Sequence, residues 1–382
     1  MSTPAPVSAL TLEEFRDQIP ALRRWAWVDT PGSPPAAAPV VRALRESIDA
    51  WETGDFSWTD WDASGGASRS AFAQLLGVPS KSVALLNSVA EAAALVGASL
   101  TAGRVVVGAN EFRSNLLPWL SLERSGWTVT KAPGTAGAVT TDSLLSAIDD
   151  RTTLVAASEV LSFSGSRLDV VALARRCQEV GARLFLDLTQ SFGVLPFDAD
   201  LVAADFVAVH GYKWLIAPRG CAWLHVRDEA IDDLVPLAPG WKAVSEPYAQ
   251  YFGVPTSLPA GARKLDASTA WLPWTGALPA LNMALALNRS DVEKRALDLA
   301  AEFRTKVRRL GLVVAPVEGE SQIVVVQLPY SDRVVAALAA HRVKATVRPG
   351  ALRVGFHGFN TAADLDALIE AISDGIGGGA TT

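Results

Sequence analysis

The chain has 382 residues, 49% of them hydrophobic and 19% charged, which is the composition of a globular protein with a large core. Its 34 basic and 40 acidic residues give a net charge of −6, which excludes the basic surface typical of nucleic-acid-binding proteins. Two cysteines cannot form a disulfide framework. No apolar run is long enough to span a membrane and the N-terminus lacks a signal-peptide pattern, so we expect a cytoplasmic protein without a membrane partner.

Helical and extended patterns alternate from the N-terminus onward. The sequence predicts a short helix over 11–18, a strand over 25–29 and an amphipathic helix over 39–51. Three tryptophans fall within 51–61 and are followed by DASGG, which predicts an irregular surface segment before a helix over 70–76. For these aromatic residues we favour a dimer contact over a substrate entrance.

The remainder of the chain continues the alternation. Strands are predicted at 83–86, 104–107, 127–131, 153–157, 183–186, 206–209, 221–226 and 323–328. Helices are predicted from residue 90, over 142–150, 168–180, 331–341 and 364–372, directly after Val226, and over 278–310 with a break near 289–291. Strands that alternate with helices indicate βαβ units, so we expect an α/β fold with a mostly parallel sheet.

Four polar side chains follow two of the buried strands. Asp187 ends the strand at 183–186 and Gln190 comes three residues later, while His210 and Lys213 follow the strand at 206–209. Since ligands bind at the carboxyl ends of parallel strands, these side chains should meet in one pocket. A lysine that can form a Schiff base and a carboxylate for a pyridinium nitrogen suit pyridoxal 5′-phosphate (PLP).

The order of Asp187, Gln190, Lys213 and a glycine turn at Gly220 resembles the class V aminotransferase-like PLP enzymes. That family contains cysteine desulfurases, kynureninases and isopenicillin N epimerase-like proteins. The resemblance implies fold type I, with a mostly parallel large domain and a smaller α+β domain. The implied bounds are 30–275 for the large PLP-binding domain, and 1–29 with 276–382 for the small domain.

The resemblance also implies roles around the cofactor ring. Lys213 would carry the Schiff base and move the proton at the substrate Cα, and Asp187 would hold the pyridine nitrogen. Gln190 would donate to the phenolic oxygen. Phe112, in the stretch EFRSNLLPW, would stack on the ring as in kynureninases.

Further residues are implied for the cofactor phosphate. Ser88 and the backbone of Val89 lie where a strand meets a helix, a junction that favours anions. His210 and Tyr212 precede the lysine and are expected to bind the phosphate. Thr269, in LDASTAW, resembles a threonine that reaches the PLP of the partner subunit in relatives. A homodimer with active sites at the interface is therefore implied.

The C-terminal motif LRVGFHGFNT implies the substrate contacts. It resembles the family pattern R-x-S-x-x-x-Y-N-T, with Gly355 in place of the serine and Phe359 in place of the tyrosine. Arg353 would bind the α-carboxylate of a small amino-acid substrate in bidentate geometry. Asn115 is expected to contact the substrate as well. No metal site is expected.

The type of reaction is less constrained than the cofactor. Desulfurases need a cysteine shortly before the C-terminal arginine, and the segment HRVKATVRPG (341–350) has none, so cysteine desulfurase activity is not expected. The stretches EFRSNLLPW and GYKWLIAPRG resemble epimerase-like members, some of which are carbon–sulfur lyases. We therefore favour β-elimination from an S-conjugated cysteine, through an external aldimine, in a biosynthetic pathway.

Other outcomes stay open at this point. A class V aminotransferase is the first alternative, and an amino-acid epimerase or a kynureninase-like hydrolase is the next. A PLP-binding protein without catalysis is disfavoured, because Lys213 and Asp187 are both present.

Overall fold

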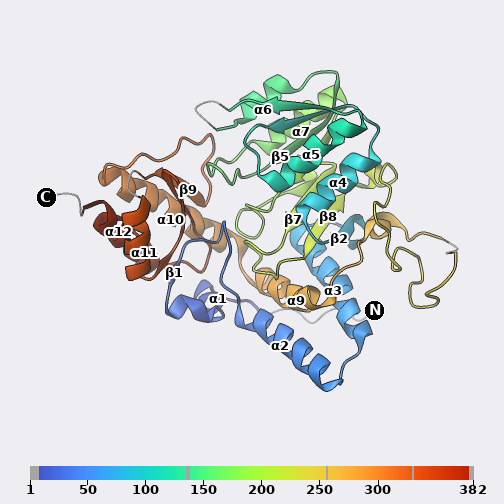
Figure 1. Ribbon diagram of the computed structural model, residues 1–382, viewed down its shortest axis with the longest axis horizontal. Coiled ribbons are helices and arrows are strands. Elements are labelled where there is room, and N and C mark those ends of the chain that lie inside the picture. Colours follow the sequence, from blue (N-terminus) through green and yellow to red (C-terminus); the bar gives the residue numbers. More distant parts are fainter. Residues whose placement is uncertain (1–7, 135–137, 255–256, 329–330, 378–382) are drawn as a thin grey trace.

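The computed structural model describes residues 8–134, 138–254, 257–328 and 331–377 (Figure 1). Part of the N-terminal stretch considered above for a signal peptide, residues 1–7, lies outside these ranges. The strands are β1 Ala26–Trp27, β2 Val83–Leu86, β3 Arg104–Gly108, β4 Thr128–Ala132, β5 Thr152–Ser158, β6 Arg183–Asp187, β7 Phe206–His210, β8 Ala222–Val226, β9 Ile323–Gln327, β10 Val343–Lys344, β11 Thr346–Arg348 and β12 Ala351–Gly355.

The α-helices connect and cover these strands. They are α1 Leu12–Asp17, α2 Ala38–Thr53, α3 Trp58–Leu76, α4 Val89–Ser99, α5 Leu117–Ser121, α6 Thr141–Ala147, α7 Val170–Val180, α8 Ala199–Val202, α9 Trp271–Ala286, α10 Arg289–Arg309, α11 Ser331–Ala340 and α12 Ala362–Gly377. Two short 3₁₀ helices matter below: η3 Arg113–Asn115 and η5 Asp228–Ala230.

One seven-stranded sheet organises the larger part of the molecule. Its order is β2-β8-β7-β6-β5-β3-β4. Strand β8 runs antiparallel to both of its neighbours, and the other pairs are parallel. The predicted α/β fold with a mostly parallel sheet is therefore confirmed.

Helices cover both faces of this sheet, so its strands are apolar on both sides. Leu184 and Leu186 of β6 enter a core that also contains side chains of α3, α7 and α9. Phe185, between them, enters the opposite core with side chains of α4 and α5. The continuous apolar runs seen in the sequence are what a two-sided burial requires.

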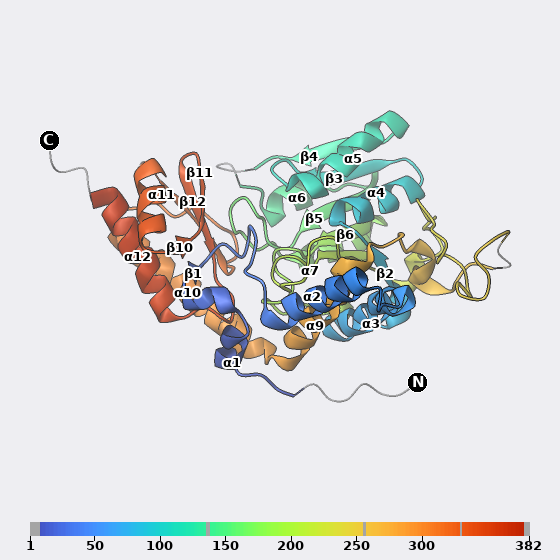
Figure 2. The ribbon, with the colours of Figure 1, turned by 60° about the horizontal axis from the view of Figure 1, so that its bottom comes forward.

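The C-terminal residues form a second, smaller layer beside the large sheet (Figure 2). Strand β12 pairs antiparallel with β9 and with β11. The N-terminal strand β1 pairs with β10 of this part, and Asp29 forms a bridge with Gly355. The predicted domain limits stay a prediction, but residue 275 falls inside α9 rather than in a loop.

Three predicted elements differ from the structure. Helix α3 begins at Trp58, although the glycines at 65 and 66 predicted an irregular segment. Gly65 faces β2, where a Cβ would lie 3.1 Å from Leu85 Cδ1, so the glycine permits close packing. The helix expected after Val226 is only the short η5. The long C-terminal helical region begins earlier, at Trp271, and breaks at Leu287 and Asn288.

The tryptophan-rich segment 51–61 meets a second aromatic segment, residues 241–251. The Trp58 ring lies 5.7 Å from that of Trp241, 6.5 Å from Tyr248 and 6.2 Å from Tyr251. It also stacks on Trp271 with a centroid distance of 5.6 Å. Residues 241–251 belong to the segment that projects from the edge of the sheet beside β2 (Figure 1).

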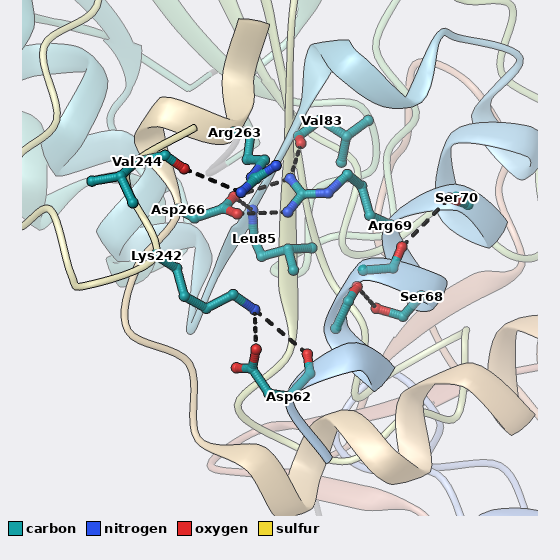
Figure 3. A network of polar contacts seen from close by, with 12 residues as sticks. Asp62, Ser68, Arg69, Ser70, Val83, Leu85, Lys242, Val244, Arg263 and Asp266 are labelled. Atoms are coloured by element: carbon teal, nitrogen blue, oxygen red, sulfur yellow. Dashed lines mark hydrogen bonds and ion pairs between the residues drawn. The ribbon is translucent and has the colours of Figure 1, made fainter. Parts of the chain in front are cut away.

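Buried ion pairs anchor this projecting segment (Figure 3). Lys242 Nζ lies 2.8 Å from a carboxylate oxygen of the buried Asp62 on α3. Arg69, also on α3, pairs with Asp266 at 2.5 Å, and Asp266 in turn accepts a hydrogen bond from Leu85 N of β2 at 2.8 Å. These contacts explain why α3 continues through its glycines.

No helix in the described ranges is both long and apolar enough to cross a lipid bilayer.

Candidate active site

Lys213 lies in the connection between β7 and β8 and is 4% exposed. Burial, with the positive charges of Arg353, Arg219 and Arg348, lowers its pKa to about 8, while Asp187 opposes the shift. The amine is therefore far easier to deprotonate than an ordinary lysine, as a group that must act as a nucleophile requires.

Asp187 ends β6, as predicted, and its carboxylate faces the same space as Lys213. The side chain is 5% exposed, and Oδ1 accepts a hydrogen bond from Thr189 N at 2.8 Å. Burial raises the pKa of Asp187, against the effects of the Thr189 hydrogen bonds and of Lys213. A cation placed against this carboxylate would reverse the shift, because an opposite charge favours the ionised form.

A second buried carboxylate, Glu111, lies near Asp187. It accepts hydrogen bonds from Ser158 N at 2.9 Å, Ser158 Oγ at 2.8 Å and Phe112 N at 2.7 Å. Burial and the charge of Asp187 raise the pKa of Glu111 to about 7. Glu111 was not assigned a role from the sequence, yet it ties the turn that carries Phe112 to the end of β5.

Phe112 lies directly over the reactive lysine. Its ring centre is 5.1 Å from Lys213 Nζ, and the side chain is 46% exposed although it is a large apolar group. An exposed aromatic face beside a buried amine is an arrangement that a planar ligand would cover. The geometry is consistent with the predicted stacking role.

Gln190 is at the centre of a hydrogen-bond network rather than free. Its Nε2 donates to Pro31 O at 3.1 Å and to Ser162 Oγ at 3.0 Å, and its Oε1 accepts from Trp214 Nε1 at 3.0 Å. Both amide hydrogens are thus used within the chain. A bond from Gln190 to the cofactor would have to replace one of them, so that role stays a prediction.

Arg353 reaches the same network from β12. Its Nη1 donates to Ser162 Oγ at 2.8 Å, and the side chain is 6% exposed. Within the described residues its buried Nε has no hydrogen-bond partner. Burial and the nearby Arg348 lower the pKa of Arg353 to about 10. Asp29 opposes this shift, but no carboxylate among the described residues forms an ion pair with Arg353, so its guanidinium is suited to bind one from a ligand.

Asp29 and Arg348 border the arginine. Arg348 Nη2 donates to Ser162 O at 3.4 Å, and its charge interacts with that of Asp29. Asp29 also accepts a hydrogen bond from Thr346 Oγ1. These residues come from the N-terminal stretch and from β11, and no sequence motif connects them.

The two residues expected at the phosphate before Lys213 lie side by side. The rings of His210 and Tyr212 meet edge to face with centroids 4.6 Å apart. Burial lowers the pKa of His210 to about 4, so the ring is neutral near pH 7. In the described ranges its buried Nε2 has no partner, which leaves a hydrogen-bonding position open.

Ser88 and Val89 lie at the start of α4, as predicted. Ser88 is the N-cap, and its Oγ accepts a hydrogen bond from Glu91 N at 3.2 Å. Val89 is buried at the first position of the helix, where its backbone N–H has no partner within the helix. This end of the helix is suited to an anion.

Two predicted residues stay apart from these contacts. Asn115, in η3, is fully buried, and its Oδ1 accepts a hydrogen bond from Trp119 Nε1 at 3.2 Å. Its Nδ2 has no partner among the described residues, so the predicted substrate contact stays open. Thr269 is half-buried just before α9, and its role toward a second subunit stays a prediction.

The residues present fit pyridoxal phosphate. Lys213 and Asp187 face one space under the exposed ring of Phe112. Buried polar atoms without protein partners border that space, at His210 Nε2 and Arg353 Nε. Buried polar groups are normally satisfied, so unpartnered ones of this kind point to a ligand with several oxygens.

Comparison with known proteins identifies the family. The family model described as Aminotransferase class-V matches residues 63–368, so the chain belongs to this family and is a pyridoxal phosphate-dependent enzyme. The Bacillus subtilis protein YcbU, described as an uncharacterized aminotransferase, is 26% identical over 365 residues, which cover 94% of this chain and 97% of that protein.

Solved structures show the same fold. The cysteine desulfurase CsdA from Escherichia coli superposes with a TM-score of 0.83 at 22% identity, over 97% of this chain and 99% of that one. A complex of the cystine C–S lyase C-DES with its product cysteine persulfide gives a TM-score of 0.84 at 19% identity, over 94% and 99% of the two chains. The chain is thus a class V aminotransferase-like enzyme related to cysteine desulfurases.

Proposed function

We propose that the chain cleaves the carbon–sulfur bond of an S-conjugated cysteine by β-elimination. The proton leaves Cα, the sulfur leaves Cβ with the bonding electrons, and water completes the reaction. One S-conjugated cysteine and one water give one thiol, one pyruvate and one ammonia. The substrate is an amino acid, and the product thiol carries the S-substituent.

The observation that carries this proposal is the absence of a thiol that could accept sulfur. The sequence has two cysteines, Cys177 and Cys221, and neither precedes Arg353 in the segment 341–350. Both are buried. Burial raises the pKa of Cys177 to about 12 and that of Cys221 further, which makes both thiols poor nucleophiles. Sulfur released at Cβ therefore departs with the substituent.

Lys213 supplies the base for this reaction. When bound, the cofactor withdraws electrons from the substrate Cα and so labilises the Cα–H and Cβ–S bonds. Because its pKa is about 8, the Lys213 amine can take the Cα proton near neutral pH. Asp187 would hold the ring nitrogen in its protonated form, and Phe112 would restrain the ring without offering a proton. A thiolate is a good leaving group and needs little acid assistance.

Arg353 orients the substrate. Its unpartnered Nε and the adjacent amino group can form a bidentate pair with the α-carboxylate, while Ser162 holds Nη1 at 2.8 Å. Asn115 Nδ2 is available for a further polar contact from the side of η3. The carboxylate is thereby fixed on the β12 side, and Cα is turned toward Lys213.

The cofactor phosphate is assigned to the start of α4. Ser88 and the backbone N–H of Val89 would hold it, together with His210 and Tyr212. Thr269 of a second copy of the chain would complete the site. The proposal therefore includes a homodimer with the active sites at its interface, and the aromatic residues within 51–61 are proposed to lie at the contact.

The reaction is tested with S-conjugated cysteines and the holoenzyme. Thiol and pyruvate should appear in a 1:1 ratio without any added keto acid. Lys213→Arg, which keeps the charge but cannot act as the base in the same way, is the matched control and should release neither. Turnover that requires a keto acid, and that transfers the amino group to it, would show that the chain is an aminotransferase instead.

A further inference from the structure

Arg219 lies at the edge of the active site, in the turn between β7 and β8, and its side chain is exposed. Its guanidinium carbon is 5.0 Å from the centre of the Tyr212 ring. Lys213 Nζ lies 5.5 Å from the centre of the same ring. Both cations therefore contact the same ring, and Arg219 lies close to the candidate active site.

Arg219 is one of three arginines whose charges act on Lys213, and among the described residues it forms no ion pair. The charges of Arg353, Arg219 and Arg348 all act on Lys213. In the proposed function Arg353 binds the α-carboxylate of the substrate, and the charge of Arg348 interacts with that of Asp29. In the part of the chain that the structure describes, no carboxylate lies within ion-pair distance of Arg219, whose contact is the face of Tyr212.

A cavity opens beside this guanidinium. It has a volume of about 270 Å³, and its lining includes Tyr212, Arg219 and the turn Gly32–Ala36. Val40 and Leu44 of α2 are among its apolar lining residues. The same N-terminal turn reaches the substrate side, because Pro31 O accepts the hydrogen bond from Gln190 Nε2 at 3.1 Å. Tyr212, which lines this cavity, precedes Lys213 directly and so connects the cavity wall to the candidate active site.

We propose that Arg219 determines substrate specificity by binding an acidic group at the end of the S-substituent. The apolar residues of α2 would contact the methylene groups of this substituent, and the guanidinium would pair with its terminal carboxylate or sulfonate. The cavity of about 270 Å³ is large enough for a group of several heavy atoms, since roughly 10–15 Å³ of such volume already holds one water. The inference rests on the proposed function, because it specifies the substituent of the same substrate.

The test uses two substrates that differ only in charge, S-(2-carboxyethyl)cysteine and its amide, S-(2-carbamoylethyl)cysteine. The holoenzyme is titrated with each one while the cofactor absorbance is followed, which gives a dissociation constant whatever reaction comes next. Thiol release then gives kcat/KM for each. The variants are Arg219→Gln and Arg219→Lys, and the control is Arg42→Gln, which removes an exposed arginine from α2 beside a different cavity.

The wild-type enzyme should prefer the acid over the amide by roughly tenfold in binding and in kcat/KM, as expected for one partly exposed charged hydrogen bond. Arg219→Gln should bring this ratio close to one, Arg219→Lys should keep part of it, and Arg42→Gln should keep all of it. An equal preference for both substrates in the wild type would overturn the inference.

Two further results would separate the role of Arg219 from cofactor binding and from the proposed lyase function. If Arg219→Gln weakens PLP binding in equilibrium dialysis and leaves the acid-to-amide ratio unchanged, Arg219 serves the cofactor phosphate and the inference is wrong. If neither substrate releases thiol but the binding ratio still depends on Arg219, the proposed lyase function fails while the acid-binding role of Arg219 is retained.

Discussion

Truncation of Arg353 gives a quantitative test of substrate binding. Arg353→Ala removes a guanidinium that is 6% exposed and that the account pairs with the α-carboxylate. Removing one partner of a buried charge pair costs roughly 2–5 kcal/mol, which corresponds to about 30-fold to several thousand-fold in affinity. We expect the lower end, because Arg348 approaches the same Ser162 carbonyl, at 3.4 Å compared with 3.3 Å for Arg353.

The assay is a titration of the holoenzyme with an amino acid, followed through the cofactor absorbance. Arg348→Ala on the neighbouring strand is the matched control and should have a smaller effect, since Arg348 is half-buried and Arg353 is buried. Arg353→Lys should recover little of the affinity, because an ammonium cannot form the bidentate pair. Unchanged substrate affinity in Arg353→Ala, or loss of PLP instead, would refute the reasoning and make Arg353 a structural residue.

Three further predictions follow from the geometry. Asp187→Asn should keep the fold and much of the PLP but lose most activity, since an amide cannot pair with a protonated ring nitrogen; near-normal turnover would reject that role. The pKa of Glu111 is raised from 4.5 to about 7, so between pH 4.5 and about 7 the folded apoprotein binds more protons than the unfolded one. The free energy of unfolding of the apoprotein should therefore fall by up to roughly 3 kcal/mol as the pH rises through this window. Urea unfolding measures this change, which should be smaller in Glu111→Gln. Gly355→Ala should destabilise the fold by roughly 1–3 kcal/mol, because its Cβ would lie 2.4 Å from Pro31 Cγ; an unchanged melting temperature would contradict this.

The sequence predicted the sheet well because its strands are continuous apolar runs. Val83–Leu86 has the predicted bounds, and Asp187 and Lys213 lie where the ends of β6 and β7 place them. A parallel sheet brings such strand ends together whatever the loops do, so the pairing of these two residues needs only the strand pattern.

The contacts that were not predicted join segments far apart in the chain. Ser162 links Gln190 to Arg353, and Pro31 holds the same glutamine from the N-terminus. The role of Glu111 was not predicted, because nothing in the local sequence shows that its carboxylate accepts hydrogen bonds from Ser158. The end of helix α3 was predicted but its start at Trp58 was not, because a tertiary contact with Leu85, not intrinsic propensity, favours Gly65.

Every residue role proposed above depends on the cofactor being bound to the amine of Lys213. Borohydride reduction of the holoenzyme followed by peptide mapping tests it most directly. The pyridoxyl group should be found on Lys213, the buried lysine whose pKa is lowered to about 8. Lys242 pairs with Asp62, and Lys264 lies 3.8 Å from Asp232. A pyridoxyl group on either of these lysines would contradict the account.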